Sequence, residues 1–285
     1  MTTVAGLLRT SSLPALETRI LLEHVLGWRR TELITRDNEE LAEDCVGRFE
    51  ALAQRRSAGE PIAQLVGTRE FFGLKFEVTP DVLIPRPETE LLVEIALEKT
   101  AGIEAPRVLD LGTGSGAIAV AIAFSRDDAE VWAVDRSAGA LTVAARNAAR
   151  LLGPGRKITL LESDWTDVLD PALRFELIVS NPPYIAQNDP HLSEGDLRFE
   201  PRTALTDEAD GLAAIRTIVQ TAPFFLTSGG SLWLEHGYDQ AANARALLTA
   251  RGFSDVRSER DLAGIERVSG GFLHGLTRRR PQAAL

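Results

Sequence analysis

Cysteine is nearly absent from this chain of 285 residues, which contains only Cys45. A single cysteine excludes an intramolecular disulfide and a metal site built from several thiolates. Cys45 falls within a helical pattern, where a lone cysteine is most often a small buried apolar side chain. We therefore expect neither a disulfide framework nor a bound metal.

Long apolar runs and an excess of positive charge are also missing. No stretch approaches the roughly 20 apolar residues of a membrane span, and the N-terminus lacks the pattern of a signal peptide. The 31 Lys and Arg against 41 Asp and Glu give a net charge of -10 at pH 7. Proteins that grip long polyanions usually carry a basic face. We expect a soluble, cytoplasmic monomer that binds no membrane and no nucleic acid directly, although a local basic patch stays compatible with this balance.

The first part of the chain, residues 1–61, contains helical patterns only. Apolar residues recur every three or four positions from Leu13 to Val25 and again from Leu41 to Leu52. A Gly-Glu-Pro break ends the second run. We predict a small all-helical domain.

Residues 62–86 are predicted to form a β-hairpin linker. Within it Phe72, Leu74, Phe76 and Val78 alternate with glycine or charged residues, the period of a strand or hairpin. The segment IPRPETE then interrupts the pattern with two prolines and opens a helix.

The sequence from 87 to 276 alternates short apolar runs with helical patterns. The runs are RVLDL, EVWAVD, KITLLESD, FELIVS and GGSLWLEHG, and the helical patterns cover 115–124, 137–151, about 208–226 and 238–251. Strands alternating with helices imply βαβ units, so we predict an α/β, Rossmann-like domain with a mainly parallel sheet. FSDVRSERD and ERVSGGFLHG are predicted as an antiparallel C-terminal edge hairpin, and 277–285 as a frayed tail.

A glycine turn joins the first strand of this domain to a helix, in VLDLGTGSGAIA. Glycines let the backbone approach a ligand closely, and a helix N-terminus offers free N–H groups. Gly112, Gly114 and Ala117 fit the relaxed dinucleotide fingerprint, which alone is a weak signal. Asp110 would repel a pyrophosphate but attract the sulfonium and ammonium groups of S-adenosylmethionine. The alternative is that Asp110 only forms the turn.

Two more acidic residues and a tryptophan follow the next strands. Asp135 lies about 20 residues beyond the glycine turn, where a carboxylate can accept hydrogen bonds from ribose hydroxyls. Asp164 could bind an adenine amino group, while Trp165 either packs on the adenine ring or is an ordinary core aromatic. Open α/β sheets bind ligands at the carboxyl ends of their strands, so the combination favours S-adenosylmethionine over NAD.

The fourth strand ends in S-N-P-P-Y, residues 180–184. The Asn181 side-chain carbonyl and the Pro182 backbone carbonyl can accept both N–H bonds of a planar –NH₂ group and aim its nitrogen at a methyl group. Tyr184 would stack on such a flat target. The simplest alternative is a proline-rich end to the strand. No general base is evident, and His191 in the next loop is either a proton acceptor or an ordinary loop residue.

Several segments resemble the release-factor glutamine methyltransferases, a family also called PrmC or HemK. They are PIAQLVGTREFFGLKFEVTPDVLIPRPETE, VLDLGTGSGAIA, ESDW, IVSNPPYI, DPHLSEGDLRFEPRTAL, LEHG and DLAGIERVSGG. The glycine motif is shared by most class I methyltransferases, and Asn-Pro-Pro-Tyr by nucleic-acid amino methyltransferases, whereas PRPETE and RFEP are far more particular. The match covers nearly all of the chain after the first 61 residues, which match in helical character.

The resemblance implies a class I methyltransferase fold and transfer of a methyl group from S-adenosylmethionine to N5 of the glutamine in the Gly-Gly-Gln tripeptide of class I peptide-chain release factors. The helical domain would dock that partner. Asn181, Pro182, Pro183 and Tyr184 would hold the glutamine side chain. Arg86 and Glu88 would lie beside the cleft, unless they only form a loop ion pair. The candidate cofactor-binding residues are then Asp110, Gly112, Thr113, Gly114, Ser115, Gly116, Asp135, Asp164, Trp165 and Asn181.

Two other functions compete with this prediction. A DNA or RNA amino methyltransferase acting on adenine N6, cytosine N4 or guanine N2 could use the same corner on a flipped base. The acidic charge and the lack of a basic, aromatic-interleaved segment disfavour it. A helical adaptor with a vestigial nucleotide fold is disfavoured because every cleft position is chemically intact.

Overall fold

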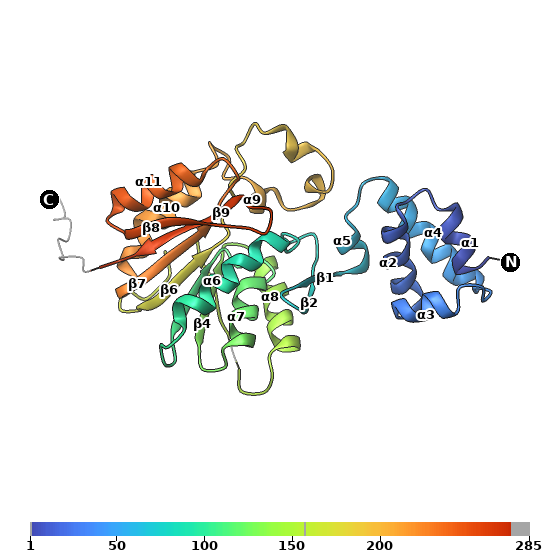
Figure 1. Cartoon of the computed structure of the whole chain (residues 1–285), viewed down its shortest axis with the longest axis horizontal. Helices are drawn as coiled ribbons and strands as arrows, with labels where there is room; N and C mark the ends of the chain where they lie inside the picture. The colour runs from blue at the N-terminus through green and yellow to red at the C-terminus, as the bar shows by residue number, and fades with distance from the viewer. Residues whose placement is uncertain (1, 157, 275–285) are drawn as a thin grey trace.

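The computed structural model describes residues 2–156 and 158–274 and shows a helical part beside a larger α/β part (Figure 1). The helical part consists of α1 (Val4–Thr10), α2 (Ala15–Leu26), α3 (Arg30–Thr35), α4 (Glu43–Ser57) and α5 (Ile62–Val66). Leu21, Leu22 and Phe49 lie in its buried core. The two longest helices coincide with the predicted patterns, whereas α1, α3 and α5 are too short to show a period. The α5 helix opens the range that we predicted as a hairpin linker.

The β-hairpin departs from the predicted alternation at its turn. β1 (Thr68–Phe71) pairs antiparallel with β2 (Leu74–Glu77). Phe71 and Phe76 are both buried and meet edge to face with ring centroids 6.0 Å apart. Phe72 instead occupies the turn with φ 52°, next to Gly73 with φ 70°. The alternation through Phe72 is therefore wrong, because the two-residue turn takes left-handed conformations at both central positions.

One sheet of seven strands, counted over the described residues, organises the α/β part in the order β5-β4-β3-β6-β7-β9-β8. The strands are β3 (Arg107–Leu111), β4 (Glu130–Asp135), β5 (Ile158–Glu162), β6 (Phe175–Ser180), β7 (Leu226–Glu235), β8 (Ser254–Arg260) and β9 (Glu266–Phe272). Neighbours from β5 to β7 are parallel, and β9 is antiparallel to both β7 and β8. The predicted fold class is confirmed. The chain order reverses around β3, which is where open α/β sheets form a ligand crevice.

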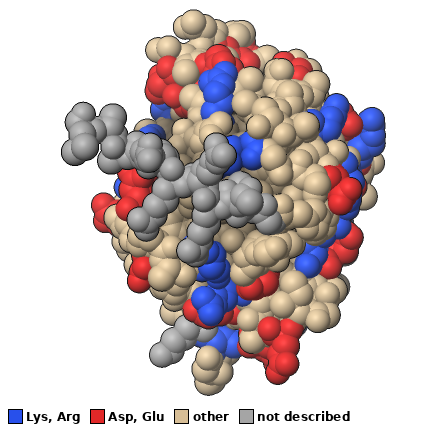
Figure 2. Space-filling model, turned by 90° about the vertical axis from the view of Figure 1, so that its left-hand side faces the viewer, with Lys and Arg blue, Asp and Glu red and all other residues tan. Residues whose placement is uncertain are grey.

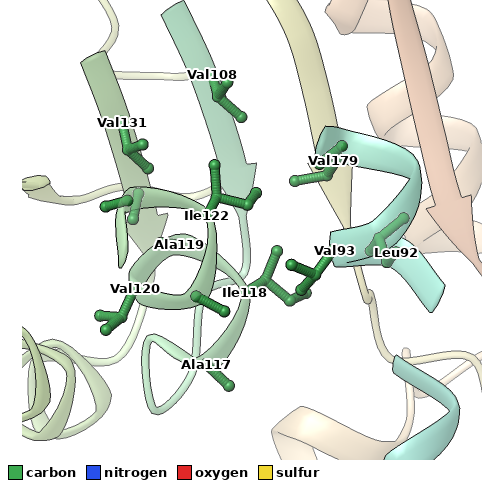
Figure 3. Close-up of a cluster of buried hydrophobic side chains, with 14 of the residues drawn as sticks. Leu92, Val93, Val108, Ala117, Ile118, Ala119, Val120, Ile122, Val131 and Val179 are labelled. Carbon is green, nitrogen blue, oxygen red and sulfur yellow. The ribbon is translucent and has the colours of Figure 1, made fainter. Parts of the chain in front are cut away.

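Helices cover both faces of this sheet (Figure 1). One face carries η1 (Pro87–Thr89), α6 (Glu90–Thr100), α7 (Ala117–Ser125) and α8 (Ala138–Leu151), and the other carries α10 (Ala213–Thr221), η4 (Ala222–Phe224) and α11 (Ala241–Arg251). In Figure 3, Ile122 of α7 lies toward Val108 and Val131 of the sheet, and Ile118 toward Val93 of α6. Because α7 packs against the sheet and two helices, its sequence is apolar on all sides.

A long connection between β6 and α10 reaches toward the helical part (Figure 1). It contains η2 (Pro190–Ser193), η3 (Leu197–Phe199) and α9 (Arg202–Leu205). Arg56 Nη1 donates to Asp196 Oδ1 at 2.8 Å, and Gln64 Nε2 donates to the Phe199 carbonyl at 3.1 Å. These contacts join the helical part to the connection. The helix predicted from about 208 begins only at Ala213, because the preceding residues belong to this connection.

The outer surface carries mixed charge. On the face drawn in Figure 2, acidic and basic side chains are interspersed rather than gathered by sign. Over the residues that the structure describes, no helix is long and apolar enough to cross a membrane. The predicted tail, 277–285, lies outside the described residues.

Candidate active site

The turn between β3 and α7 is built from glycines in left-handed conformations. Gly112, Gly114 and Gly116 have φ values of 75°, 55° and 80°, which residues with a side chain rarely adopt. At Gly116 a Cβ would also lie 3.1 Å from the Cβ of Ala144 in α8. The turn therefore runs close against α8 while its other end stays open to the crevice.

Asp135 at the end of β4 holds this turn in place. Its carboxylate accepts the Gly114 N–H at 2.8 Å and the Ser137 N–H at 2.9 Å. Burial raises the pKa of Asp135, and these two N–H donors oppose the rise. Each carboxylate oxygen keeps a second lone pair, so Asp135 can still accept hydrogen bonds from a ligand in the crevice.

Asp110 lies beneath the turn rather than in its open face. The side chain is fully buried, and Oδ2 accepts the Thr113 hydroxyl at 2.7 Å. Oδ1 is buried and has no hydrogen-bond partner among the described residues. Burial raises the pKa of Asp110 to about 7. A positive charge placed above the turn would stabilise the ionised form of this buried carboxyl group.

A cavity of about 400 Å³ lies at the carboxyl ends of the central strands. Among the predicted site residues it is lined by Arg86, Gly112, Thr113, Gly114, Ser115, Asp135, Asp164, Trp165, Asn181 and Pro183. The remaining predicted residues do not line it: Asp110, Gly116, Glu88, Pro182 and Tyr184. One cavity thus brings together the glycine turn, the end of β4, the loop after β5 and the corner after β6.

Trp165 closes one end of the cavity next to the glycine turn. Its ring lies 3.5 Å from the position that a Cβ on Gly112 would occupy. The residue has φ 49° and is half-buried, with part of its surface open to the cavity. Asp164 beside it is exposed. An aromatic face and a carboxylate therefore stand together where a planar, amino-bearing ring could bind.

The Asn-Pro-Pro-Tyr corner begins where β6 ends beside β3. The Ser180 hydroxyl donates to the Leu111 carbonyl at 2.6 Å, which ties the two strand ends together. Asn181 Nδ2 donates to Thr89 Oγ1 at 3.1 Å. With its N–H group used in this way, Asn181 has its carbonyl oxygen left to accept from a ligand. Pro183 lines the cavity, whereas Pro182 is buried behind it.

Tyr184 lies away from the cavity, which differs from its predicted stacking position. Its hydroxyl is 3.4 Å from Glu235 Oε1, and burial raises its pKa. Its carbonyl accepts Gln240 Nε2 at 3.0 Å, and the same Gln240 atom donates to the Gly211 carbonyl at 3.1 Å. Gln240 was missed by the sequence analysis. Its hydrogen bond holds the Tyr184 backbone, the last residue of the corner, from a position 56 residues away in the chain.

Arg86 and Glu88 do not pair with each other. Arg86 lines the cavity and forms an ion pair with Glu200, whose other oxygen accepts the Ile84 N–H at 2.8 Å. Glu200 belongs to the RFEP segment, and burial raises its pKa. Glu88 is exposed. The alternative of a loop ion pair is therefore corrected: the partner of Arg86 comes from the connection after β6.

His191 stands apart from the cavity. The side chain is exposed, and its Nδ1 lies 2.6 Å from Asp189 Oδ1, which raises the pKa of the imidazole. Asp189 also accepts the His191 backbone N–H at 2.9 Å. These contacts describe a local turn and give His191 no path to the corner.

Asn147 is a second structural residue that the sequence analysis missed. It is fully buried in α8, and its Nδ2 donates to the carbonyls of Ser115 and Glu77 at 2.9 and 3.0 Å. Its Oδ1 accepts the Glu77 N–H at 2.7 Å. An asparagine inside an alanine-rich helix was the available signal. It joins the hairpin to the glycine turn.

The sheet order, the glycine turn and the Asn-Pro-Pro-Tyr corner are together those of a class I methyltransferase. Two family models match the chain: the PrmC N-terminal domain over residues 2–67 and the methyltransferase small domain over residues 87–195. A release factor glutamine methyltransferase of Burkholderia pseudomallei is 66% identical over 276 residues, which cover 96% of this chain and 97% of that protein. The Escherichia coli enzyme of the same name is 46% identical, with 93% and 94% covered. The chain belongs to the release factor glutamine methyltransferase family.

A solved structure shares the fold. The Thermus thermophilus 16S rRNA N2 G1207 methyltransferase superposes with a TM-score of 0.53 over 73% of this chain and 50% of that one. The two sequences are 21% identical. Similarity at this level supports the predicted class I fold and says nothing about the substrate.

Proposed function

We propose that this protein transfers a methyl group from S-adenosylmethionine to N5 of the glutamine in the Gly-Gly-Gln tripeptide of class I peptide-chain release factors. The observation that carries the proposal is the orientation of Asn181. Its N–H group is bound to Thr89, so its carbonyl oxygen is an acceptor at the same cavity as the glycine turn. Family membership supports the choice of a release factor, because the relatives carry that name.

The cavity fits S-adenosylmethionine better than a pyrophosphate-bearing dinucleotide. Asp135 and Asp164 line it, and Asp110 lies buried below with an oxygen that has no partner among the described residues. These carboxylates favour a positive ligand and oppose a phosphate. The open space at Gly114 lets the backbone approach the methionine part. Asp135 accepts from the ribose, and Trp165, beside Gly112, covers the adenine.

Asn181 positions the acceptor nitrogen. An amide nitrogen is a poor nucleophile because its lone pair is delocalised. The Asn181 carbonyl accepts one of its N–H bonds. Pro182 itself is buried behind the cavity, and in this proposal its backbone carbonyl at the same corner accepts the other. These hydrogen bonds strengthen as the nitrogen becomes more positive, so they stabilise the transition state more than the bound substrate.

The bonds and charges of the transfer balance without a residue acting as base. The bound cofactor supplies a methyl carbon on a sulfonium. The amide nitrogen forms its bond to that carbon as the carbon–sulfur bond breaks, and S-adenosylhomocysteine leaves. The N-methylated amide then carries an extra proton, which is strongly acidic and passes to water.

The helical part is the docking element of this proposal. The predicted division is 1–61 as the docking domain, 62–86 as the linker and 87–276 as the methyltransferase domain, and α5, in the linker range, packs with the helical core. The contacts from Arg56 and Gln64 to the connection after β6 place it next to the cavity wall. A macromolecular partner could therefore contact both parts while its glutamine enters the cavity. The protein acts as a monomer and binds no nucleic acid in this scheme.

The assay uses labelled S-adenosylmethionine with a purified class I release factor. We expect label in the intact factor and none when its tripeptide glutamine is changed to alanine. Short DNA and RNA duplexes and single strands are tested in parallel, because an amino methyltransferase for nucleobases shares the corner motif. Label in nucleic acid with none in the release factor would refute the proposal.

A further inference from the structure

Thr89 is the hydrogen-bond partner of the Asn181 side-chain amide. It lies at the end of η1, is 5% exposed and lines the cavity. Asn181 Nδ2 donates to its hydroxyl oxygen at 3.1 Å across 92 residues of sequence. A side-chain amide has an oxygen and an NH₂ group of nearly equal size, so its hydrogen-bond partner selects the orientation.

Glu235, the last residue of β7, is a neighbour of Thr89. It is 1% exposed, its Oε1 is 3.4 Å from the Tyr184 hydroxyl, and its Oε2 has no hydrogen-bond partner among the described residues. Burial raises the pKa of Glu235 to about 7, and the neighbouring hydroxyls of Thr89 and Tyr184 oppose this rise. The unpartnered Oε2 is therefore available to accept the hydroxyl hydrogen of Thr89, the neighbour that opposes the rise most.

A hydroxyl has a single hydrogen to donate, and this limits how Thr89 can bind the Asn181 amide. Thr89 has one O–H bond, and if Glu235 accepts it only lone pairs remain for Asn181. Reversing the Asn181 amide would then set two oxygens against each other and lose a hydrogen bond. Glu235 and Thr89 together hold the carbonyl of Asn181 toward the cavity.

We propose that Thr89, supported by Glu235, is a positioning residue that makes the site specific for an amide over a carboxylate. This inference rests on the proposed function. An outward Asn181 carbonyl accepts an N–H of glutamine, whereas it repels the oxygens of glutamate. Once the amide is free to turn, its NH₂ group can face the cavity and bind a carboxylate.

The experiment compares Thr89→Val with Thr89→Ser. Valine keeps the shape and removes the hydroxyl, while serine keeps the hydroxyl and removes a methyl group. Two quantities are measured: the KM of the release factor bearing Gly-Gly-Gln, and the Ki of a Gly-Gly-Glu variant of the factor as a competitive inhibitor. The ratio of Ki to KM reports discrimination between amide and carboxylate.

We expect Thr89→Val to lower this ratio about tenfold, the equivalent of about 1.4 kcal/mol, and to lower kcat. Thr89→Ser should keep the wild-type ratio, whatever its effect on the rate. An active Thr89→Val enzyme with an unchanged ratio, or an equal loss in both variants, would overturn the inference alone. A wild-type enzyme that methylates no release factor would overturn the proposed function as well.

Glu235 offers an independent pair of variants. Glu235→Gln keeps an acceptor oxygen for Thr89, so the ratio should stay near the wild-type value. Glu235→Leu removes that acceptor and frees Thr89 to turn its hydrogen toward Asn181, so the ratio should fall as in Thr89→Val. An active Glu235→Leu enzyme that keeps the wild-type ratio would contradict the support of Thr89 by Glu235.

Discussion

Gly116 allows a quantitative test of how the glycine turn is closed. Replacing it with alanine places a side chain on a residue with φ 80° and puts the new Cβ 3.1 Å from Ala144 Cβ and 3.2 Å from Ala144 Cα. The left-handed conformation costs about 1–2 kcal/mol for a residue with a side chain. Overpacking adds about 1–3 kcal/mol. We expect Gly116→Ala to lower the free energy of unfolding by about 2–5 kcal/mol.

Gly114→Ala is the matched control. Gly114 has φ 55°, but among the described residues only its own chain neighbours lie within 4 Å of the position that a Cβ would occupy. It should lose only the conformational part, about 1–2 kcal/mol. Urea unfolding of the ligand-free protein, followed by circular dichroism, gives both values if the slopes agree.

A double variant separates packing from conformation. Adding Ala144→Gly to Gly116→Ala should recover part of the loss, which is a coupling between contacting sites. Equal losses at Gly114 and Gly116, with no such coupling, would refute the packing argument.

Two other predictions concern buried polar groups. Gln240→Leu removes the donor to the carbonyls of Tyr184 and Gly211, and each hydrogen bond is worth about 1 kcal/mol. We expect kcat to fall while the Kd for S-adenosylmethionine stays near wild type. An equal loss in kcat and in cofactor affinity would contradict a role for Gln240 in holding the corner. For Asp110, the native state holds its proton up to about pH 7 while the unfolded chain releases it near its ordinary value of 3.8. Stability of the ligand-free protein should therefore fall as pH rises through this range, by up to about 1.4 kcal/mol per pH unit for this group. Asp110→Asn should remove that part of the slope in urea titrations, and an unchanged slope would show that Asp110 does not titrate there.

For strands that are buried on both faces of the sheet, the sequence predicted the first and last residues correctly. β3, β4 and β6 have the bounds of the runs RVLDL, EVWAVD and FELIVS, because a parallel strand covered on both sides is apolar throughout. The hairpin failed at one position, since Phe71 and Phe72 are the same residue type and only the turn geometry separates them. The short helices of the N-terminal part are held by packing rather than by a repeating pattern.

Some residues of the candidate site could be predicted from the sequence and others could not. The glycine turn, Asp135 and Asn181 follow strands directly, so sequence position alone predicted that they meet. Thr89, Gln240 and Asn147 act through partners 92, 56 and 70 residues away in the chain. Thr89 and Gln240 carry no local signal, and Asn147 only that of an asparagine in an alanine-rich helix, because the role of each is defined by the side chain or carbonyl that the fold brings to it.

The contacts between the helical part and the connection after β6 have a mechanical consequence. Arg56 is bonded to Glu17 at 2.9 Å as well as to Asp196, and Arg198 donates to the Ala58 carbonyl. The same connection supplies Glu200, which anchors Arg86 at the cavity. One chain of contacts therefore runs from α4 through residues 196–200 to Arg86, which lines the cavity. Under the proposed function, a release factor held by the helical part would act on the same connection that anchors Arg86 at the cavity.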